Sequence, residues 1–146
     1  MRETYTPLVD SANLGAHFGL RIFFKLEMCN PTGSYKDRFV AVLMQDFLEC
    51  RVKACIATSS GNTGAALAAY SARHGITCSV FVNEFVPDGK LQQMRGYDAH
   101  IFRVRDFITH PETTERVYVR LRRISEETGI PIVVSAYRYC PRGMLS

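Results

Sequence analysis

The chain has 146 residues, of which 47% are hydrophobic and 22% are charged, and its formal net charge is +4. That length is enough for one soluble globular domain, or for one domain and part of another. A charge this small excludes the strongly basic character of most nucleic-acid-binding proteins, so we expect no nucleic-acid partner.

The N-terminal third of the chain predicts a strand and a helix that are separated by a sharp break. Residues 21–27 alternate in polarity and are rich in β-prone side chains, which favours a strand. Pro31 and Gly33 then interrupt the chain. We expect a helix over residues 35–50, because apolar side chains recur there at helical spacing, namely Phe39, Val42, Leu43, Phe47 and Cys50.

The start of that helix carries a lysine. Ser34 and Asp37 stand three residues apart, as in a capping box, with Asp in the position usually held by Glu or Gln. Lys36 would then lie in the first turn, where unpaired backbone N–H groups create a positive field. A cation stabilises the opposite end of a helix. Lys36 is therefore either a solvated surface residue or an amine whose charged form the site disfavours.

Beyond residue 50, short apolar runs alternate with helical patterns. The expected strands cover residues 54–58, 77–82, 100–104 and 131–135, and the expected helices cover residues 65–74, 88–97 and 111–128. Short loops join them, without an internal repeat or a low-complexity tract. Such alternation is typical of an α/β fold in which helices pack on both faces of a parallel sheet.

The cysteines and the hydropathy pattern restrict the chemistry further. Five cysteines are spaced irregularly and form no Cys-x-x-Cys pair, and no histidine stands at metal-ligand spacing. We therefore expect reduced thiols and no metal site. No apolar run is long enough to span a membrane and the N-terminus lacks the apolar stretch of a signal peptide, which favours a cytoplasmic protein.

Residues 59–64, with the sequence SSGNTG, join the strand expected at 54–58 to the next helix. Two glycines permit close approach of a ligand, and the hydroxyl groups and backbone N–H groups of a helix start can bind an anion there. The glycine spacing matches neither a P-loop nor the dinucleotide-binding fingerprint. The alternative is a glycine turn in which a serine or threonine only caps the helix.

Taken together, the two stretches are more specific than either one. SYKDR at residues 34–38 followed by SSGNTG at 59–64 resembles the pyridoxal-phosphate enzymes of the tryptophan-synthase-β type. Within them, the chain is most similar to the threonine synthases. Shorter matching pieces are TPL at 6–8, KLE at 25–27, NPTGS at 30–34, AALAAY at 65–70, FVNE at 81–84, Pro87 and GKL at 89–91. The similarity extends from about residue 6 to residue 135 and implies the fold type II architecture of that superfamily.

By this resemblance, Lys36 is the Schiff-base lysine that holds pyridoxal 5′-phosphate. An amine must be neutral to attack an aldehyde, and a helix N-terminus beside Arg38 disfavours the charged form. Once substrate displaces it, the freed amine would transfer protons. The alternative for Lys36 is a solvent-exposed helix lysine without a chemical role.

The resemblance also assigns roles to the loop. Asn62 would hydrogen-bond the 3′ oxygen of the cofactor; the alternative is a turn residue that tolerates a left-handed backbone. The substrate's α-carboxylate would be held at the helix N-terminus by Ser59, Ser60, Gly61 and Thr63. The implied reaction converts O-phosphohomoserine to threonine and phosphate, by γ-elimination of phosphate and addition of water at the β-carbon.

The family's architecture divides the chain into three parts. Residues 1–50 would be a partial large-domain segment with the lysine helix, residues 51–135 the small α/β domain, and residues 136–146 a truncated tail. Further along the chain, family members supply a glycine-rich cup for the cofactor phosphate and a Ser or Thr facing the pyridine nitrogen. Neither has a counterpart here. We therefore expect an N-terminal portion with weak or no activity alone, and exposed apolar side chains on the 35–50 helix.

Other functions stay open at this point. A non-catalytic α/β module that binds a small anion or an amino-acid carboxylate at residues 59–63 also fits the sequence. A cysteine-synthase-like or threonine-deaminase-like activity is a weaker alternative, which the AALAAY and GKL pieces disfavour. The expected partners are a small amino-acid substrate and either a second copy of the chain or the missing C-terminal portion of the same enzyme.

Overall fold

The structure, a computed structural model, describes residues 5–134 of the chain. Its elements in chain order are β1 (Leu8–Asp10), α1 (Ala12–Phe18), β2 (Phe23–Lys25), the short 3-10 helix η1 (Glu27–Cys29), α2 (Lys36–Glu49), β3 (Ala54–Ala57), α3 (Asn62–Arg73), β4 (Thr77–Asn83), α4 (Asp88–Gly96), β5 (His100–Val104), α5 (Pro111–Thr128) and β6 (Ile132–Val133). The tail expected at 136–146 and the end of the strand expected at 131–135 lie outside the described residues.

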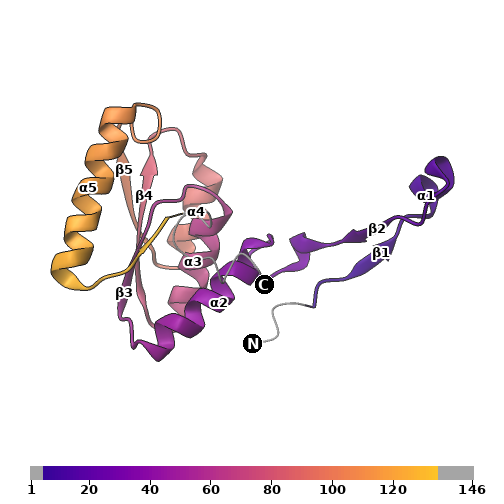
Figure 1. Ribbon diagram of the computed structural model, residues 1–146, viewed down its shortest axis with the longest axis horizontal. Helices are drawn as coiled ribbons and strands as arrows, with labels where there is room; N and C mark the ends of the chain where they lie inside the picture. The colour runs from indigo at the N-terminus through magenta and orange to yellow at the C-terminus, as the bar shows by residue number, and fades with distance from the viewer. Residues whose placement is uncertain (1–4, 135–146) are drawn as a thin grey trace.

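Four strands form a parallel sheet in the order β5-β4-β3-β6. The central pair is in register, with Cys55 of β3 opposite Cys78 of β4. Helix α5 covers one face of the sheet, and helices α2, α3 and α4 lie on the other side (Figure 1). The α/β fold predicted from the alternation of strands and helices, with helices on both faces of a parallel sheet, is confirmed.

The core lies between the sheet and helices α2, α3 and α4. The middle of β3 is fully buried, as expected of a central parallel strand that is covered on both faces. Helix α3 buries a run of small side chains that includes Ala65, Ala66 and Ala68. Their size lets α2 pack closely on α3.

Helix α2 belongs to this core, contrary to the exposed apolar side expected from the sequence. Phe39 is 3% exposed, Leu43 8% and Phe47 6%, because α3 and the sheet cover them. The expectation of an uncovered helix is therefore wrong. The division of the chain between residues 50 and 51 stays a prediction.

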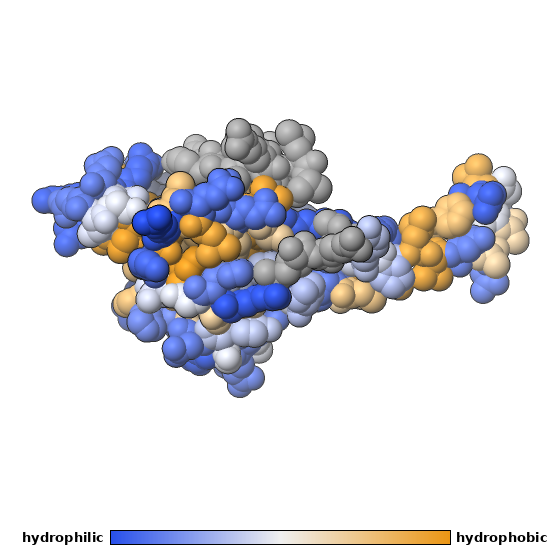
Figure 2. Space-filling model, turned by 90° about the horizontal axis from the view of Figure 1, so that it is seen from below, coloured by the Kyte–Doolittle hydropathy of each residue, from blue (hydrophilic) through white to orange (hydrophobic). Residues whose placement is uncertain are grey.

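An arm projects from this body (Figure 1). It consists of the antiparallel pair β1 and β2 with α1 between them, and Val9 lies opposite Phe24. Figure 2 shows hydrophobic residues gathered along it. The exposed apolar side chains of the arm are Leu8, Val9, Leu14, Phe18, Leu20, Phe23 and Phe24. The sequence predicts neither β1 nor α1, and the strand expected at 21–27 is shorter in the structure.

Most elements beyond residue 50 lie where the alternation predicts them. Strand β5 and helix α5 match at both ends, whereas α3 begins earlier than the expected residue 65. It begins at Asn62 because the Ala65 N–H donates to the Gly61 carbonyl oxygen at 3.1 Å. Within residues 5–134, the helices are all too short or too polar to cross a membrane.

Candidate active site

The chain turns sharply before helix α2, and two side chains hold that turn. The fully buried Asp37 carboxylate accepts hydrogen bonds from the Thr32 backbone N–H at 3.1 Å and from the Thr32 hydroxyl at 2.7 Å. Ser34 Oγ accepts a bond from the Lys36 N–H at 3.3 Å. The capping box expected between Ser34 and Asp37 is wrong, because Asp37 closes the turn on Thr32. Helix α2 begins at Lys36, in agreement with the prediction that Lys36 lies in the first turn.

The Lys36 side chain is half-buried at the start of α2. Its Nζ lies 4.5 Å from the centroid of the exposed Tyr35 ring, which is a cation–π distance. Among residues 5–134, no carboxylate pairs with this amine. A primary amine in this position is the type of group that attacks a carbonyl carbon.

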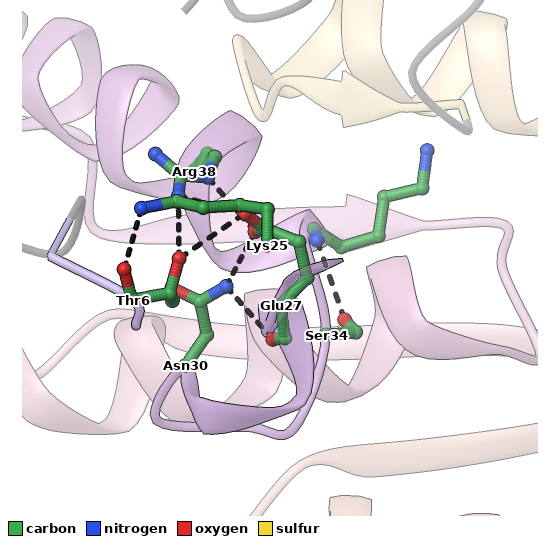
Figure 3. A network of polar contacts seen from close by, with 7 residues as sticks. Thr6, Lys25, Glu27, Asn30, Ser34 and Arg38 are labelled. Atoms are coloured by element: carbon green, nitrogen blue, oxygen red, sulfur yellow. Dashed lines mark hydrogen bonds and ion pairs between the residues drawn. The ribbon is translucent and has the colours of Figure 1, made fainter. Parts of the chain in front are cut away.

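A polar cluster of Thr6, Lys25, Glu27, Asn30 and Arg38 anchors the chain that leads into α2 (Figure 3). Arg38 binds Glu27 in a bidentate manner, with Nε donating to Oε2 and Nη2 to Oε1, each at 2.8 Å. The Thr6 hydroxyl accepts a bond from Arg38 at 3.1 Å and donates to Glu27 at 3.3 Å. Asn30 donates to Glu27 Oε2 at 2.8 Å, and Lys25 donates to the Thr6 carbonyl oxygen.

This cluster fixes the charge states of its two central residues. Hydrogen bonds from Arg38 lower the pKa of Glu27 to about 2, and the bond to Glu27 raises the pKa of Arg38. Glu27 therefore compensates the positive charge of the guanidinium group. The effect of Arg38 and of the helix N-terminus on the Lys36 amine stays a prediction.

A tight loop leads from β3 into α3. Ser59, Ser60 and Gly61 are half-buried in this loop. Ser59 Oγ accepts a hydrogen bond from the Gly61 backbone N–H at 3.5 Å. Gly64 packs so closely on the Ser59 carbonyl oxygen that a Cβ atom at position 64 would collide with that oxygen. The loop therefore needs a glycine at position 64 for close packing.

The N-terminus of α3 has no side-chain cap. Gly61 is the N-cap residue, and the first N–H bonded along the helix is that of Ala65. The N–H groups of Asn62, Thr63 and Gly64 thus have no partner within the helix and form the positive end of its dipole. Helix ends of this kind bind carboxylates and phosphates. The alternative in which a serine or threonine caps this helix is wrong.

Asn62 is the first residue of α3, and its side chain is exposed. Its Oδ1 accepts a hydrogen bond from Lys90 Nζ at 2.8 Å. Asn62 is not among the described residues with a positive φ, so the alternative of a turn residue with a left-handed backbone is wrong. Thr63, next in the chain, is buried.

Helix α4 connects the two halves of the candidate site. Lys90 reaches Asn62 at the start of α3. Three residues further along α4, Gln93 Nε2 donates to the Thr32 carbonyl oxygen at 3.4 Å. Because positions three apart share one face of a helix, the turn before α2 and the loop before α3 are both within reach of one turn of α4.

Sequence reasoning misses these connecting residues as parts of the site. A signal for Lys90 exists, since GKL belongs to the resemblance and Lys90 stands in the first turn of an expected helix, as Lys36 does. No local signal could indicate Gln93, because 61 residues separate it from Thr32. The Glu27–Arg38 pair is likewise absent from the sequence predictions, although both residues belong to matching pieces.

The donor groups of this region fit pyridoxal phosphate. Lys36 offers a primary amine for an aldehyde. Asn62, whose Oδ1 is bound by Lys90, offers the N–H groups of Nδ2 to an acceptor oxygen. The uncapped N-terminus of α3 suits a carboxylate or a phosphate. Over residues 5–134, no group of His, Cys, Asp and Glu side chains is arranged to hold a metal ion.

The chain matches one protein family and several named relatives. The family model described as "Pyridoxal-phosphate dependent enzyme" matches residues 1–145. A threonine synthase of Halalkalibacterium halodurans is 36% identical over 138 residues, which cover 94% of this chain and 37% of the relative. A threonine synthase of Methanocaldococcus jannaschii is 42% identical over 105 residues, which cover 70% of this chain and 26% of the relative. The resemblance to threonine synthases is therefore confirmed.

Solved structures share the fold. A pyridoxal 5′-phosphate-dependent aspartate racemase has a TM-score of 0.75 at 29% identity, over 92% of this chain and 41% of that chain. The serine racemase from Dictyostelium discoideum has a TM-score of 0.74 at 26% identity, over 88% of this chain and 40% of that chain. The chain thus spans well under half the length of these relatives. Because the family model matches nearly the whole sequence, the chain belongs to the family of pyridoxal-phosphate dependent enzymes.

Proposed function

We propose that this chain carries the cofactor lysine and the carboxylate site of a threonine synthase-like lyase, which converts O-phosphohomoserine to threonine and phosphate. The observation that carries the proposal is the placement of two groups within reach of one face of α4. The turn before the Lys36 amine and the uncapped N-terminus of α3 contact the same face of that helix. The relatives named threonine synthase support the choice of substrate.

Each residue has a distinct role in this proposal. Pyridoxal phosphate, when bound, supplies an electron sink for carbanions at the substrate's α and β carbons. Lys36 holds the cofactor through its amine and, once freed, moves protons at those carbons. Asn62 donates a hydrogen bond to the cofactor's 3′ oxygen and orients its ring.

The substrate carboxylate is the ligand of the α3 N-terminus in this proposal. The backbone N–H groups of the first turn point out of the helix, and the hydroxyl groups of Ser59, Ser60 and Thr63 add donors. Gly61 leaves room for the carboxylate beside the backbone, because no heavy atom lies within 4 Å of where its Cβ would stand. These contacts would hold the substrate by its carboxylate and orient it in the site.

The cofactor role of Lys36 can be tested by chemical trapping. The purified 146-residue chain is mixed with pyridoxal phosphate, reduced with borohydride and digested, and the modified lysines are mapped. We expect modification of Lys36 well above that of Lys25, Lys53 and Lys90, together with an absorption band in the visible before reduction. Labelling spread evenly over the four lysines, or its persistence at the same level in Lys36→Ala, would overturn the proposal.

The reaction needs a second measurement, which is phosphate release from O-phosphohomoserine. The chain spans 37% of the Halalkalibacterium halodurans relative, so we expect turnover by the 146 residues alone to be weak or absent. Addition of the remaining polypeptide of such a relative should raise it. If no phosphate is released even then, while Lys36 is labelled, the proposed substrate is wrong.

The uncapped N-terminus of α3 also favours a second candidate function, a non-catalytic module that binds a carboxylate or a small anion. Isothermal titration of Lys36→Ala with O-phosphohomoserine distinguishes the two functions. Binding without any trapping at Lys36 in the wild-type chain supports the module. Trapping at Lys36 supports the enzyme.

A further inference from the structure

Lys90 makes a contact that neither the resemblance nor the proposed reaction assigns. Its ammonium group donates to Asn62 Oδ1 at 2.8 Å and so joins α4 to α3. The helix that delivers it is firmly held, since Leu91 and Met94 of α4 are fully buried. Its first residue, Asp88, pairs with Arg103 of β5 at 2.8 Å. The core therefore sets the position of the helix backbone from which the Lys90 side chain extends to Asn62.

The chemistry of the two groups gives the contact a direction. A carboxamide has an acceptor end and a donor end, and a rotation of 180° exchanges them. An ammonium group carries only donors, so it can bind the oxygen end alone. With Oδ1 held by Lys90, the N–H groups of Asn62 Nδ2 must point away from Lys90.

We propose that Lys90 is a positioning residue that fixes the Asn62 carboxamide with its N–H donors presented to the ligand. This inference rests on the proposed function, in which Asn62 binds the 3′ oxygen of the cofactor. In that orientation Asn62 selects a ligand with an acceptor oxygen. The nearby positive charge of Lys90 favours an anionic oxygen over a neutral hydroxyl group.

The first test reads the Asn62 side chain without any cofactor. In the full 146-residue chain labelled with ¹⁵N, the Asn62 carboxamide signals are identified by their loss in Asn62→Ala. We expect Lys90→Met to shift both proton signals and to speed their exchange with water severalfold, and Lys90→Arg to restore the wild-type pattern. Lys53→Met, at an exposed lysine before β3, should change nothing. Unchanged Asn62 signals in Lys90→Met would overturn the inference.

The second test asks whether the fixed orientation matters for the ligand. Trapping at Lys36 is measured over a range of pyridoxal phosphate concentrations for wild type, Lys90→Met, Asn62→Ala and the double variant. We expect Lys90→Met to raise the half-saturating concentration about tenfold, and the double variant to be no weaker than Asn62→Ala alone. Such non-additivity shows that Lys90 acts through Asn62.

The outcomes separate this inference from the proposed function. Effects of the two substitutions that multiply, or a Lys90→Met curve identical to wild type, would mean that Lys90 does not act through Asn62. A wild-type chain that shows no trapping at Lys36 contradicts the proposed function, and the carboxamide signals then decide the Lys90 contact by themselves. A small change in thermal stability has no bearing, because a lysine with a surface role only would cause it as well.

Discussion

Four residues from separate pieces of the family resemblance meet in the polar cluster before α2, namely Thr6, Glu27, Asn30 and Arg38. A bidentate guanidinium–carboxylate pair has a defined geometry, so the cluster sets the direction in which the chain enters the helix. These residues support the candidate site through their contacts with one another. They determine where the Lys36 amine stands.

Replacement of Glu27 by Gln tests this cluster. The pKa of Glu27 is lowered from 4.5 to about 2, so the ionised carboxylate stabilises the fold fully above pH 4.5, and this contribution is lost as the pH falls towards 2. We expect Glu27→Gln to lower the free energy of unfolding by about 1–3 kcal/mol at neutral pH. Urea unfolding measured at a series of acid pH values should also show that the free energy of unfolding falls less steeply with decreasing pH in the variant than in the wild type.

Glu126→Gln is the matched control, because it changes an exposed carboxylate on α5. It should leave the free energy of unfolding at neutral pH, and the loss of that free energy as the pH falls, close to those of the wild type. If the Glu27 variant followed the same pH profile as this control, the Arg38 pair would have no energetic role.

Local signals in the sequence locate the main residues of the site, but not what holds them. The Pro–Gly break and the polar residues after it predict a helix from residue 35 with Lys36 in its first turn, and α2 starts one residue later, at Lys36. The Lys90–Asn62 bond joins residues 28 apart and depends on how α4 packs, which no local pattern contains. The chemical roles of Lys36, Asn62 and the serine loop stay predictions.

At the level of elements, the start of α3 depends on a single small residue. A Cβ atom at position 64 would collide with the Ser59 carbonyl oxygen and would lie 3.2 Å from the Met94 methyl group. Gly64→Ala should therefore push the loop away from the helix and cost about 1–3 kcal/mol in urea unfolding. We also expect it to reduce trapping of pyridoxal phosphate at Lys36.

Gly96→Ala in α4 is the control for that variant, since no heavy atom outside the neighbouring backbone lies within 4 Å of its Cβ position. Alanine favours a helix over glycine by up to about 1 kcal/mol, so this variant should be neutral or slightly stabilised. Equal losses of stability in the two variants would contradict a specific role for the close contact at Gly64.

The elements also show which patterns a sequence can reveal. In β4 every second side chain is buried, and in α4 the buried Leu91 and Met94 stand three residues apart, so the apolar residues recur with a period that predicts each element. The arm is different, because its apolar side chains face solvent in the described chain and no buried face sets a period. The sequence does not predict that α2 is buried, for another reason. Its burial depends on the small side chains of α3, and the spacing of those side chains does not identify the helix that packs on them.

For the molecule as a whole, the exposed apolar side chains of the arm form a candidate surface for association. Val9 and Phe24 lie opposite each other and are both exposed. We expect the chain to self-associate with rising concentration in analytical ultracentrifugation. Phe24→Thr should weaken that association about tenfold or more, since burial of a phenylalanine is worth about 1.5–3 kcal/mol.

Leu48→Gln provides the comparison, because Leu48 is exposed on α2 at a similar level, far from the arm in sequence. It should leave the association unchanged. A wild-type chain that remains monomeric at every concentration, or a Phe24 variant that associates as strongly as wild type, would contradict a role for the arm.

The arm also divides the chain into two parts that open at different rates. A two-stranded ribbon is marginally stable by itself in water, whereas β3 and β4 lie inside the core. The amide protons of β1 and β2 can therefore exchange with solvent each time the ribbon separates, while the body stays folded. Those of β3 and β4 are released only when the core opens, so a single chain should show two well-separated classes of hydrogen exchange.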